Sequence, residues 1–154
     1  MLASIIVGTA MIFVTVIIES LFVSMAVAVL NRFGERLVKY HPLIRNTAVL
    51  STLTLWLMAA ISVGLWLWAL LFYQLGEFES METAIYFATV SATTLGYGDL
   101  LLSETWQLLS GFLAANGLVL FSLTTAFLFD VLRRIDDDEL TANTRPQKTR
   151  GALQ

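Results

Sequence analysis

One hexapeptide stands out in this sequence for its chemical potential, Thr94-Leu95-Gly96-Tyr97-Gly98-Asp99. Glycine adopts a positive φ without steric cost. Two glycines alternating with larger residues therefore allow successive carbonyl oxygens to point to one side of an extended backbone. A row of such oxygens can replace the water around a dehydrated cation. The segment therefore predicts main-chain binding of cations.

The rest of the chain offers little for catalysis. Cysteine is absent, and His41, which precedes Pro42 in a polar connector, is the single histidine. We interpret His41 as an ordinary interfacial residue, because no grouping of nucleophile, base and orienting residue surrounds it. The sequence predicts no enzyme, no cofactor and no nucleic-acid partner.

Composition and apolar runs indicate an all-α membrane protein. The 154 residues are 57% hydrophobic and 14% charged, whereas about a quarter of residues are charged in soluble proteins. Three runs are long enough to cross a bilayer: Leu2 to Leu30, Thr47 to Leu75 and Trp106 to Phe129.

A fourth apolar run, Thr83 to Thr93, is too short to cross the membrane. We expect a helix from about Met81 to Thr93 that enters the membrane and returns, which requires that it be buried in protein or line water. The C-terminal end of such a helix carries roughly half a negative charge. That end would face a cation held by the following loop.

The distribution of charge predicts the orientation. All nine basic residues fall into two clusters, and by the positive-inside rule both are cytoplasmic. The segment 76–105 carries only acidic charges, which places it outside, where it would concentrate cations. The N-terminus is then outside and the C-terminus inside, as in a multi-pass protein of the cell membrane. The basic clusters are Arg32, Arg36, Lys39 and Arg45, and Arg133, Arg134, Arg145, Lys148 and Arg150; the outer acids are Glu77, Glu79, Glu82, Asp99 and Glu104.

These features divide the chain into four parts. Residues 1–30 form an N-terminal transmembrane helix, which we expect to be retained although Ala26-Val27-Ala28 is similar to a signal-peptide cleavage site. Residues 31–46 form a basic linker, residues 47–132 the cation-binding domain, and residues 133–154 a largely disordered tail. In the linker, Arg32, Arg36 and Lys39 either lie on a surface helix that contacts anionic lipids or belong to a solvated loop.

Thr83 to Asp99 resembles the pore helix and selectivity filter of the potassium channel superfamily, and with its flanking helices the resemblance covers about residues 47–132. It implies a homotetramer in which an outer helix, pore helix and inner helix surround a filter. K⁺ would bind the carbonyls of Thr94, Leu95, Gly96 and Tyr97 and the Thr94 hydroxyl. Gly98 and Asp99 would support the filter from behind, and Tyr97 would point away from the ion path.

The chain departs from the family pattern in three places. Leu95 replaces the commoner valine, which keeps the carbonyl but changes packing behind the filter. Tyr86 and Phe87 stand where many members carry paired tryptophans, and we expect the Tyr86 hydroxyl to replace an indole donor toward Asp99. Val90 occupies a position where some members have glutamate, which would thin the support around Asp99.

The third span contains two glycines. Gly117 lies near a family position where glycine lets the inner helix bend, and both a hinge and a close-packing role are open for it. We expect packing at Gly111. The residues expected to line an inner cavity are Leu118, Phe121, Ser122 and Thr125.

Glu19 is the one ionisable residue deep inside a predicted span. Such residues usually face protein or water and often carry function. We expect either a neutral carboxyl that holds helices together through a Ser or Thr, or a pH-sensing group.

Four aromatic residues near the outer ends of the second and third spans predict an interfacial belt. Trp56 lies too deep for that belt and predicts helix packing or lipid contact. The expected belt residues are Trp66, Trp68, Tyr73 and Trp106.

Together these features predict one subunit of a potassium-selective channel that conducts K⁺ passively. The alternatives are a weakly selective cation channel and a non-conducting regulatory membrane subunit.

Overall fold

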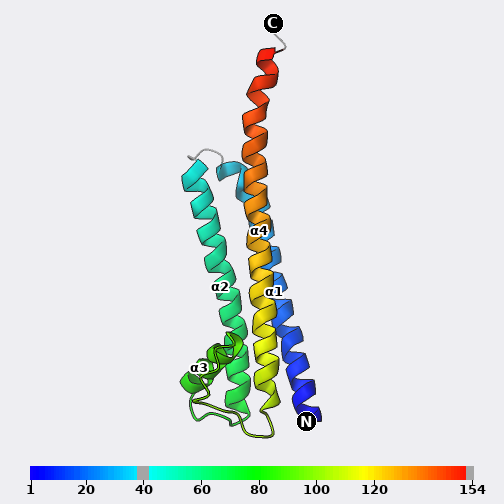
Figure 1. Ribbon diagram of the computed structural model, residues 1–154, viewed down its shortest axis with the longest axis vertical. Helices are drawn as coiled ribbons and strands as arrows, with labels where there is room; N and C mark the ends of the chain where they lie inside the picture. The colour runs from blue at the N-terminus through cyan, green and yellow to red at the C-terminus, as the bar shows by residue number, and fades with distance from the viewer. Residues whose placement is uncertain (38–41, 152–154) are drawn as a thin grey trace.

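The structure, a computed structural model, describes the backbone of residues 1–37 and 42–151. Side chains are described for these residues except at positions 31, 33–37, 42, 43, 45 and 136–151. The described chain is helical, with α1 (Leu2–Leu37), α2 (Pro42–Gln74), α3 (Met81–Ala92) and α4 (Leu108–Gly151) in that order. Figure 1 shows three long helices running side by side and the short α3 near the end where α1 begins.

The three long helices contain stretches that are long and apolar enough to cross a membrane. These stretches are Leu2–Leu30, Asn46–Gln74 and Leu108–Ile135, so the predicted spans are confirmed to within a few residues at most ends and extended at the end of the third. These stretches are almost wholly apolar and contain no proline, and single glycines within them are tolerated without ending the helix. The chain is an integral membrane protein by this criterion.

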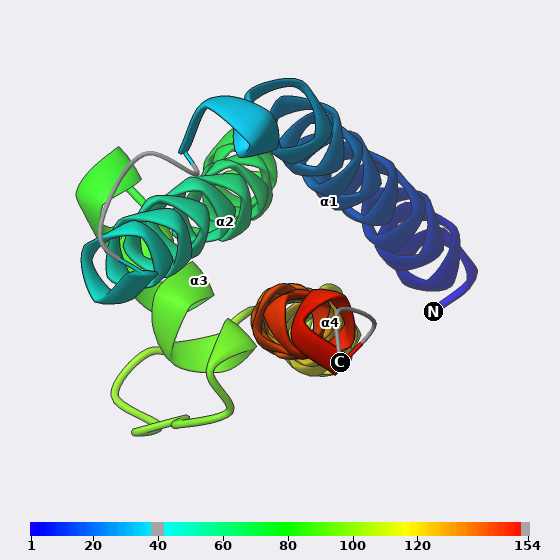
Figure 2. The ribbon, with the colours of Figure 1, turned by 90° about the horizontal axis from the view of Figure 1, so that it is seen from above.

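The four helices are arranged around the contact between α2 and α4. Viewed from above in Figure 2, α1 lies on one side of α4 and α3 lies toward the other. α1 packs on α2 and α4, and α3 packs on the same two helices, while α1 and α3 do not pack against each other within the described residues. The extra N-terminal helix therefore reaches α3 only through α2 and α4.

The larger apolar core joins α2, α3 and the start of α4. The Phe72 ring lies at its centre, edge-on to Phe87 at 5.3 Å and to Phe78 at 6.4 Å. Trp68 is only 1% exposed and packs beside Phe72. The prediction that Trp68 belongs to an interfacial belt is therefore wrong, because its ring points inward between helices. Trp66 and Tyr73 are exposed on α2, as a belt requires.

The described side chains of α1 that are fully buried are all small or polar, whereas many of its large apolar side chains are exposed. Its buried residues are Ser4, Gly8, Thr15, Glu19 and Ala26. Lipid tails are as apolar as leucine, so helices in a membrane associate through small and polar side chains rather than through apolar bulk. The distribution on α1 follows that rule.

The linker and the tail differ from the sequence prediction. The backbone of residues 31–37 continues α1, so the structure has no separate surface helix there, and α2 already begins at Pro42. α4 remains helical to Gly151, where disorder was predicted. Extending a helix that is already formed is far easier than starting one, which accounts for continuous helix in both places.

Candidate functional site

α3 is defined at its start by a cap. The Ser80 side chain accepts a hydrogen bond from the Thr83 N–H at 3.1 Å, and Glu82 lies in the first turn. A serine cap and an acidic first turn both complement the free N–H groups of a helix start. The helix ends at Ala92 with Thr93 as its C-terminal cap, within one residue of the predicted end.

The loop after α3 turns its N–H groups back toward the helix. The Thr94 N–H donates to the Ser91 carbonyl at 3.0 Å, and the N–H groups of Leu95 and Gly96 both donate to the Val90 carbonyl, at 3.0 and 3.2 Å. The last turn of α3 thus satisfies three consecutive donors of the loop. Among the described residues, no backbone donor bonds to the carbonyl oxygens of the same three residues.

Backbone dihedrals in the loop alternate in a regular way. Thr94, Gly96 and Gly98 have φ of 59°, 52° and 76°, whereas Leu95 and Tyr97 between them do not have positive φ. Such alternation in the sign of φ allows successive peptide groups to turn toward the same side. The sequence predicted this freedom for Gly96 and Gly98.

Thr94 was not expected to adopt a positive φ. It is the only described non-glycine residue that does so. A side chain in this region costs on the order of 1–3 kcal/mol, and such strain concentrates at functional sites. No pattern in the sequence marks it, apart from its place two residues before Gly96.

The side chains of the loop are uncovered by the chain's own residues. Leu95 is 56% exposed and Tyr97 is 68% exposed. The described part of the chain therefore leaves both side chains free to contact another molecule.

Tyr86 and Asp99 form the contact that the sequence suggests. The Tyr86 hydroxyl donates to Asp99 Oδ2 at 2.7 Å. This hydrogen bond to the Asp99 carboxylate raises the pKa of the Tyr86 phenol above its ordinary value, with smaller contributions from desolvation and from charge. The phenol therefore stays protonated, and stays a donor, at neutral pH.

Glu77 makes a structural contact within the segment 76–105. Its two carboxylate oxygens accept from the Ser103 N–H and the Ser103 hydroxyl, each at 2.7 Å. Glu77 thus ties the turn after α2 to the segment before α4, and it is not simply a solvated charge. Glu79, Glu82 and Glu104 are exposed.

Gly117 touches the end of α3. A Cβ at Gly117 would lie 2.1 Å from the Ala92 carbonyl oxygen, so only glycine allows this approach of α4 to the backbone of α3. A Cβ at Gly111 would meet nothing within 4 Å. Gly117 therefore has a close-packing contact, one of the two roles left open for it, because it faces α3. The packing expected at Gly111 is not found among the described residues.

Four residues of α4 were predicted to line a cavity. They lie on one open, concave face of the helix, which consists of Leu118, Phe121, Ser122, Thr125, Ala126 and Phe129. Ser122 and Thr125 donate their hydroxyls to carbonyls four residues earlier, so neither leaves an unpaired donor on that face.

Glu19 is 2% exposed, and its Oε1 accepts from the Thr124 hydroxyl on α4 at 3.0 Å. The expected contact with a threonine on a neighbouring helix is present. A second buried hydrogen bond joins the same two helices, from Asn116 Nδ2 to Thr15 Oγ1 at 2.8 Å. This pair was not predicted from the sequence, since an isolated Thr and Asn are unremarkable in helices.

α1 is held at two further points. The Ser4 hydroxyl donates to the Thr105 carbonyl at 2.8 Å. The Trp56 indole N–H of α2 donates to the Phe22 carbonyl at 3.0 Å, and the two rings pack 5.1 Å apart. Trp56 is thus a helix-packing residue, one of the two roles predicted for it.

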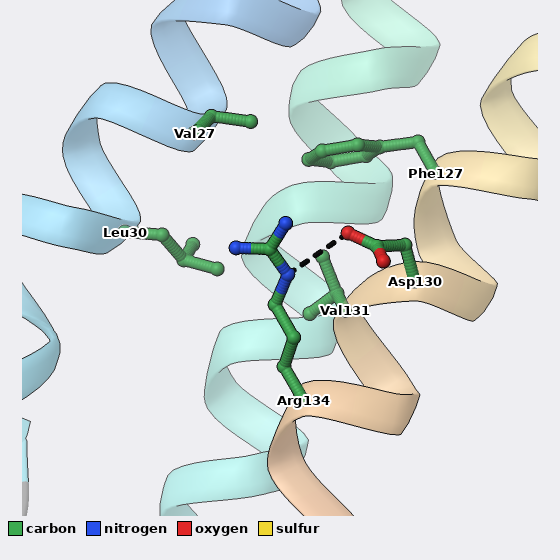
Figure 3. A pocket seen from close by; sticks show the side chains of 6 residues that line it. All are labelled: Val27, Leu30, Phe127, Asp130, Val131 and Arg134. Carbon is green, nitrogen blue, oxygen red and sulfur yellow. Dashed lines mark hydrogen bonds and ion pairs between the residues drawn. The ribbon is translucent and has the colours of Figure 1, made fainter.

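At the far end, a crevice separates α1 from α4 (Figure 3). Val27 and Leu30 face Phe127 and Val131 across it, and Arg134 Nε donates to Asp130 Oδ2 at 2.9 Å on its rim. Arg32 is exposed near this end. The side chain of Arg36 and all of Lys39 and His41 lie outside the described residues.

A family model described as an ion channel matches residues 52–134. This range is more than half of the chain and contains α3, the loop and the apolar part of α4, so the protein belongs to this ion-channel family. No curated protein and no solved structure matches the chain. Ion channels of this kind are not an enzyme family. The matched range does not include α1.

Proposed function

We propose that this protein is a potassium-selective channel in which main-chain oxygens of Thr94, Leu95, Gly96 and Tyr97, with the Thr94 hydroxyl, bind K⁺ in succession. The observation that carries the proposal is the backbone of the loop. The N–H groups of Thr94, Leu95 and Gly96 donate to carbonyls of α3, and positive φ recurs at every second residue from Thr94 to Gly98. Both features favour a row of carbonyls on one side, which is the ligand set that replaces water around K⁺.

Selectivity in this proposal comes from rings of oxygen, and one loop cannot form a ring. We therefore propose a cyclic homotetramer, with α3 as a re-entrant pore helix whose C-terminal partial charge faces the ion. The exposed Leu95 and Tyr97 side chains support it, because neighbouring subunits would cover them. Gly98, Asp99 and Tyr86 are then filter supports.

The orientation follows from charge. We place the N-terminus and the segment 76–105 outside and the C-terminus in the cytoplasm. Anionic lipid headgroups are the partners that we propose for Arg32, Arg36 and Lys39. The exposed Arg32, Arg133 and Arg134 at one end and the acidic loop at the other support this arrangement.

Flux into liposomes tests the function. Purified protein should carry K⁺ down its gradient and exclude Na⁺. Comparable K⁺ and Na⁺ fluxes would instead indicate a weakly selective cation channel, and no flux would indicate a regulatory subunit.

A pair of glycine substitutions locates the activity. Gly96→Ala and Gly76→Ala both place a Cβ at positive φ with nothing within 4 Å, so both carry a similar strain of about 1–2 kcal/mol. Gly96→Ala should abolish selective K⁺ flux, while Gly76→Ala should leave it intact. Equal loss in both variants would contradict a filter role for Gly96.

A further inference from the structure

α1 lies outside the range matched by the ion-channel family, yet it carries most of the buried polar side chains of the molecule. Within the described residues these are Ser4, Thr15 and Glu19 on α1, and Asn116 and Thr124 on α4. Polar groups inside a membrane protein are expensive to bury and usually mark function. An ordinary lipid-facing anchor would not need them.

The contact between Thr15 and Asn116 is fixed from both sides. The Thr15 hydroxyl donates to the Met11 and Ile12 carbonyls at 2.9 and 3.0 Å, which orients its lone pairs toward α4. Asn116 Nδ2 donates to that oxygen at 2.8 Å, and the Asn116 side chain is 2% exposed. Asn116 Oδ1 has no partner among the described residues, so the Thr15 contact is the one hydrogen bond that holds this amide.

The residue after Asn116 lies against the C-terminal end of α3. Gly117 approaches the Ala92 backbone so closely that any side chain would overlap its carbonyl. Ala92 ends α3, and the preceding residues Val90 and Ser91 accept the N–H groups that shape the loop. The residue of α4 that bonds to α1, Asn116, is therefore adjacent in sequence to the residue that contacts the end of α3, Gly117.

We propose that α1 is a brace for the filter, and that Thr15 and Asn116 are positioning residues. By fixing Asn116, α1 holds Gly117 against Ala92 and so keeps the carbonyls of Thr94 and Leu95 at the spacing that K⁺ requires. This inference rests on the proposed potassium-channel function. The Glu19 contact with Thr124 holds α4 further along and keeps the same face of α4 toward α1.

The test uses the full-length channel in planar bilayers. Thr15→Val keeps the shape of the side chain and removes the acceptor for Asn116. Thr54→Val is its matched control, because the Thr54 hydroxyl is exposed on α2 and donates only to the Leu50 carbonyl. The readouts are the K⁺ to Na⁺ permeability ratio from reversal potentials and the rate at which K⁺ current declines when external K⁺ is lowered.

We expect Thr15→Val to change the permeability ratio or the decline rate by roughly threefold to twentyfold, the range that corresponds to one interhelical hydrogen bond in a membrane. Asn116→Leu should have the same effect, and the double variant should add little to either. Thr15→Ser should restore wild-type behaviour, and Thr54→Val should match wild type.

A purely structural role gives a different result. If Thr15→Val lowers the thermal stability of the assembly but leaves both channel readouts unchanged, the brace is refuted. Additive effects of the two substitutions would refute it as well. The proposed function fails separately, and visibly, if wild type and Thr54→Val both pass K⁺ and Na⁺ alike.

Discussion

Thr94 carries a side chain in a backbone region that glycine usually occupies. Its φ of 59° is held by the hydrogen bond from its N–H to the Ser91 carbonyl. Strain of this kind persists only where the surroundings over-determine it. At the residue scale, the hydrogen bond to α3 therefore stabilises the conformation of the first loop residue, whereas Gly96 and Gly98 adopt positive φ without steric cost.

Tyr86 allows a direct test of filter support. Tyr86→Phe removes the hydroxyl that donates to Asp99 and leaves the ring. We expect assembly and single-channel selectivity to persist while K⁺ current declines a few-fold faster, because Asp99 loses its anchor. Current decline in planar bilayers is the measurement. Tyr73→Phe, at an exposed tyrosine of α2, is the control and should behave as wild type.

The pH dependence of this contact has a defined sign. Because the pKa of Tyr86 is raised, the contact is fully formed below the ordinary tyrosine pKa of about 10 and is lost as the pH rises through the raised value. Wild type should therefore approach the Tyr86→Phe decline rate only under strongly alkaline external solution. Convergence of the two near neutral pH would contradict this assignment.

At the scale of the helices, the sequence was informative about length and order. Runs of apolar residues predicted the three spans and α3, because crossing a bilayer requires a minimum length. Hydropathy could not distinguish side chains that face lipid from those that face protein, since both are apolar. That is why the burial of Trp68 and the Asn116 pair were missed and why close packing at Gly117 could not be told from a hinge, whereas Glu19, a charge, was identified.

Gly117 is where two helices meet most closely. Gly117→Ala would force Ala92 away and should destabilise the fold by about 1–3 kcal/mol through overpacking. Gly111→Ala is the matched control, since it enters open space and alanine favours helix by about 1 kcal/mol. Thermal unfolding of the detergent-solubilised protein measures both. Unchanged stability in Gly117→Ala would leave the hinge as the better interpretation of this glycine.

Two substitutions of Glu19 distinguish a structural role for its carboxyl group from a pH-sensing role. Glu19→Gln keeps an oxygen that can accept from Thr124, so we expect stability and the pH profile of the current to match wild type. Glu19→Leu removes the acceptor and should lose about 1 kcal/mol of helix association. A pH-dependent current that disappears in Glu19→Gln would instead identify Glu19 as a sensor.

At the scale of the whole molecule, the described chain contacts the backbone of the loop but leaves its large side chains exposed. α3 supports its N–H groups, and the side chains of Leu95 and Tyr97 remain open. α1 adds a third helix around α2 and α4 on the side away from α3 (Figure 2). Assembly around a common axis would cover the open side chains and leave α1 at the periphery.

The central claim is that main-chain oxygens of Thr94 to Tyr97 bind dehydrated K⁺ on a fourfold axis. A density map of the purified assembly, recorded once in K⁺ and once in Na⁺, tests it most directly. We predict a column of ion densities at these carbonyls in K⁺ that is weakened or rearranged in Na⁺. An assembly without a fourfold axis, or an axis without ion density in K⁺, would contradict the account.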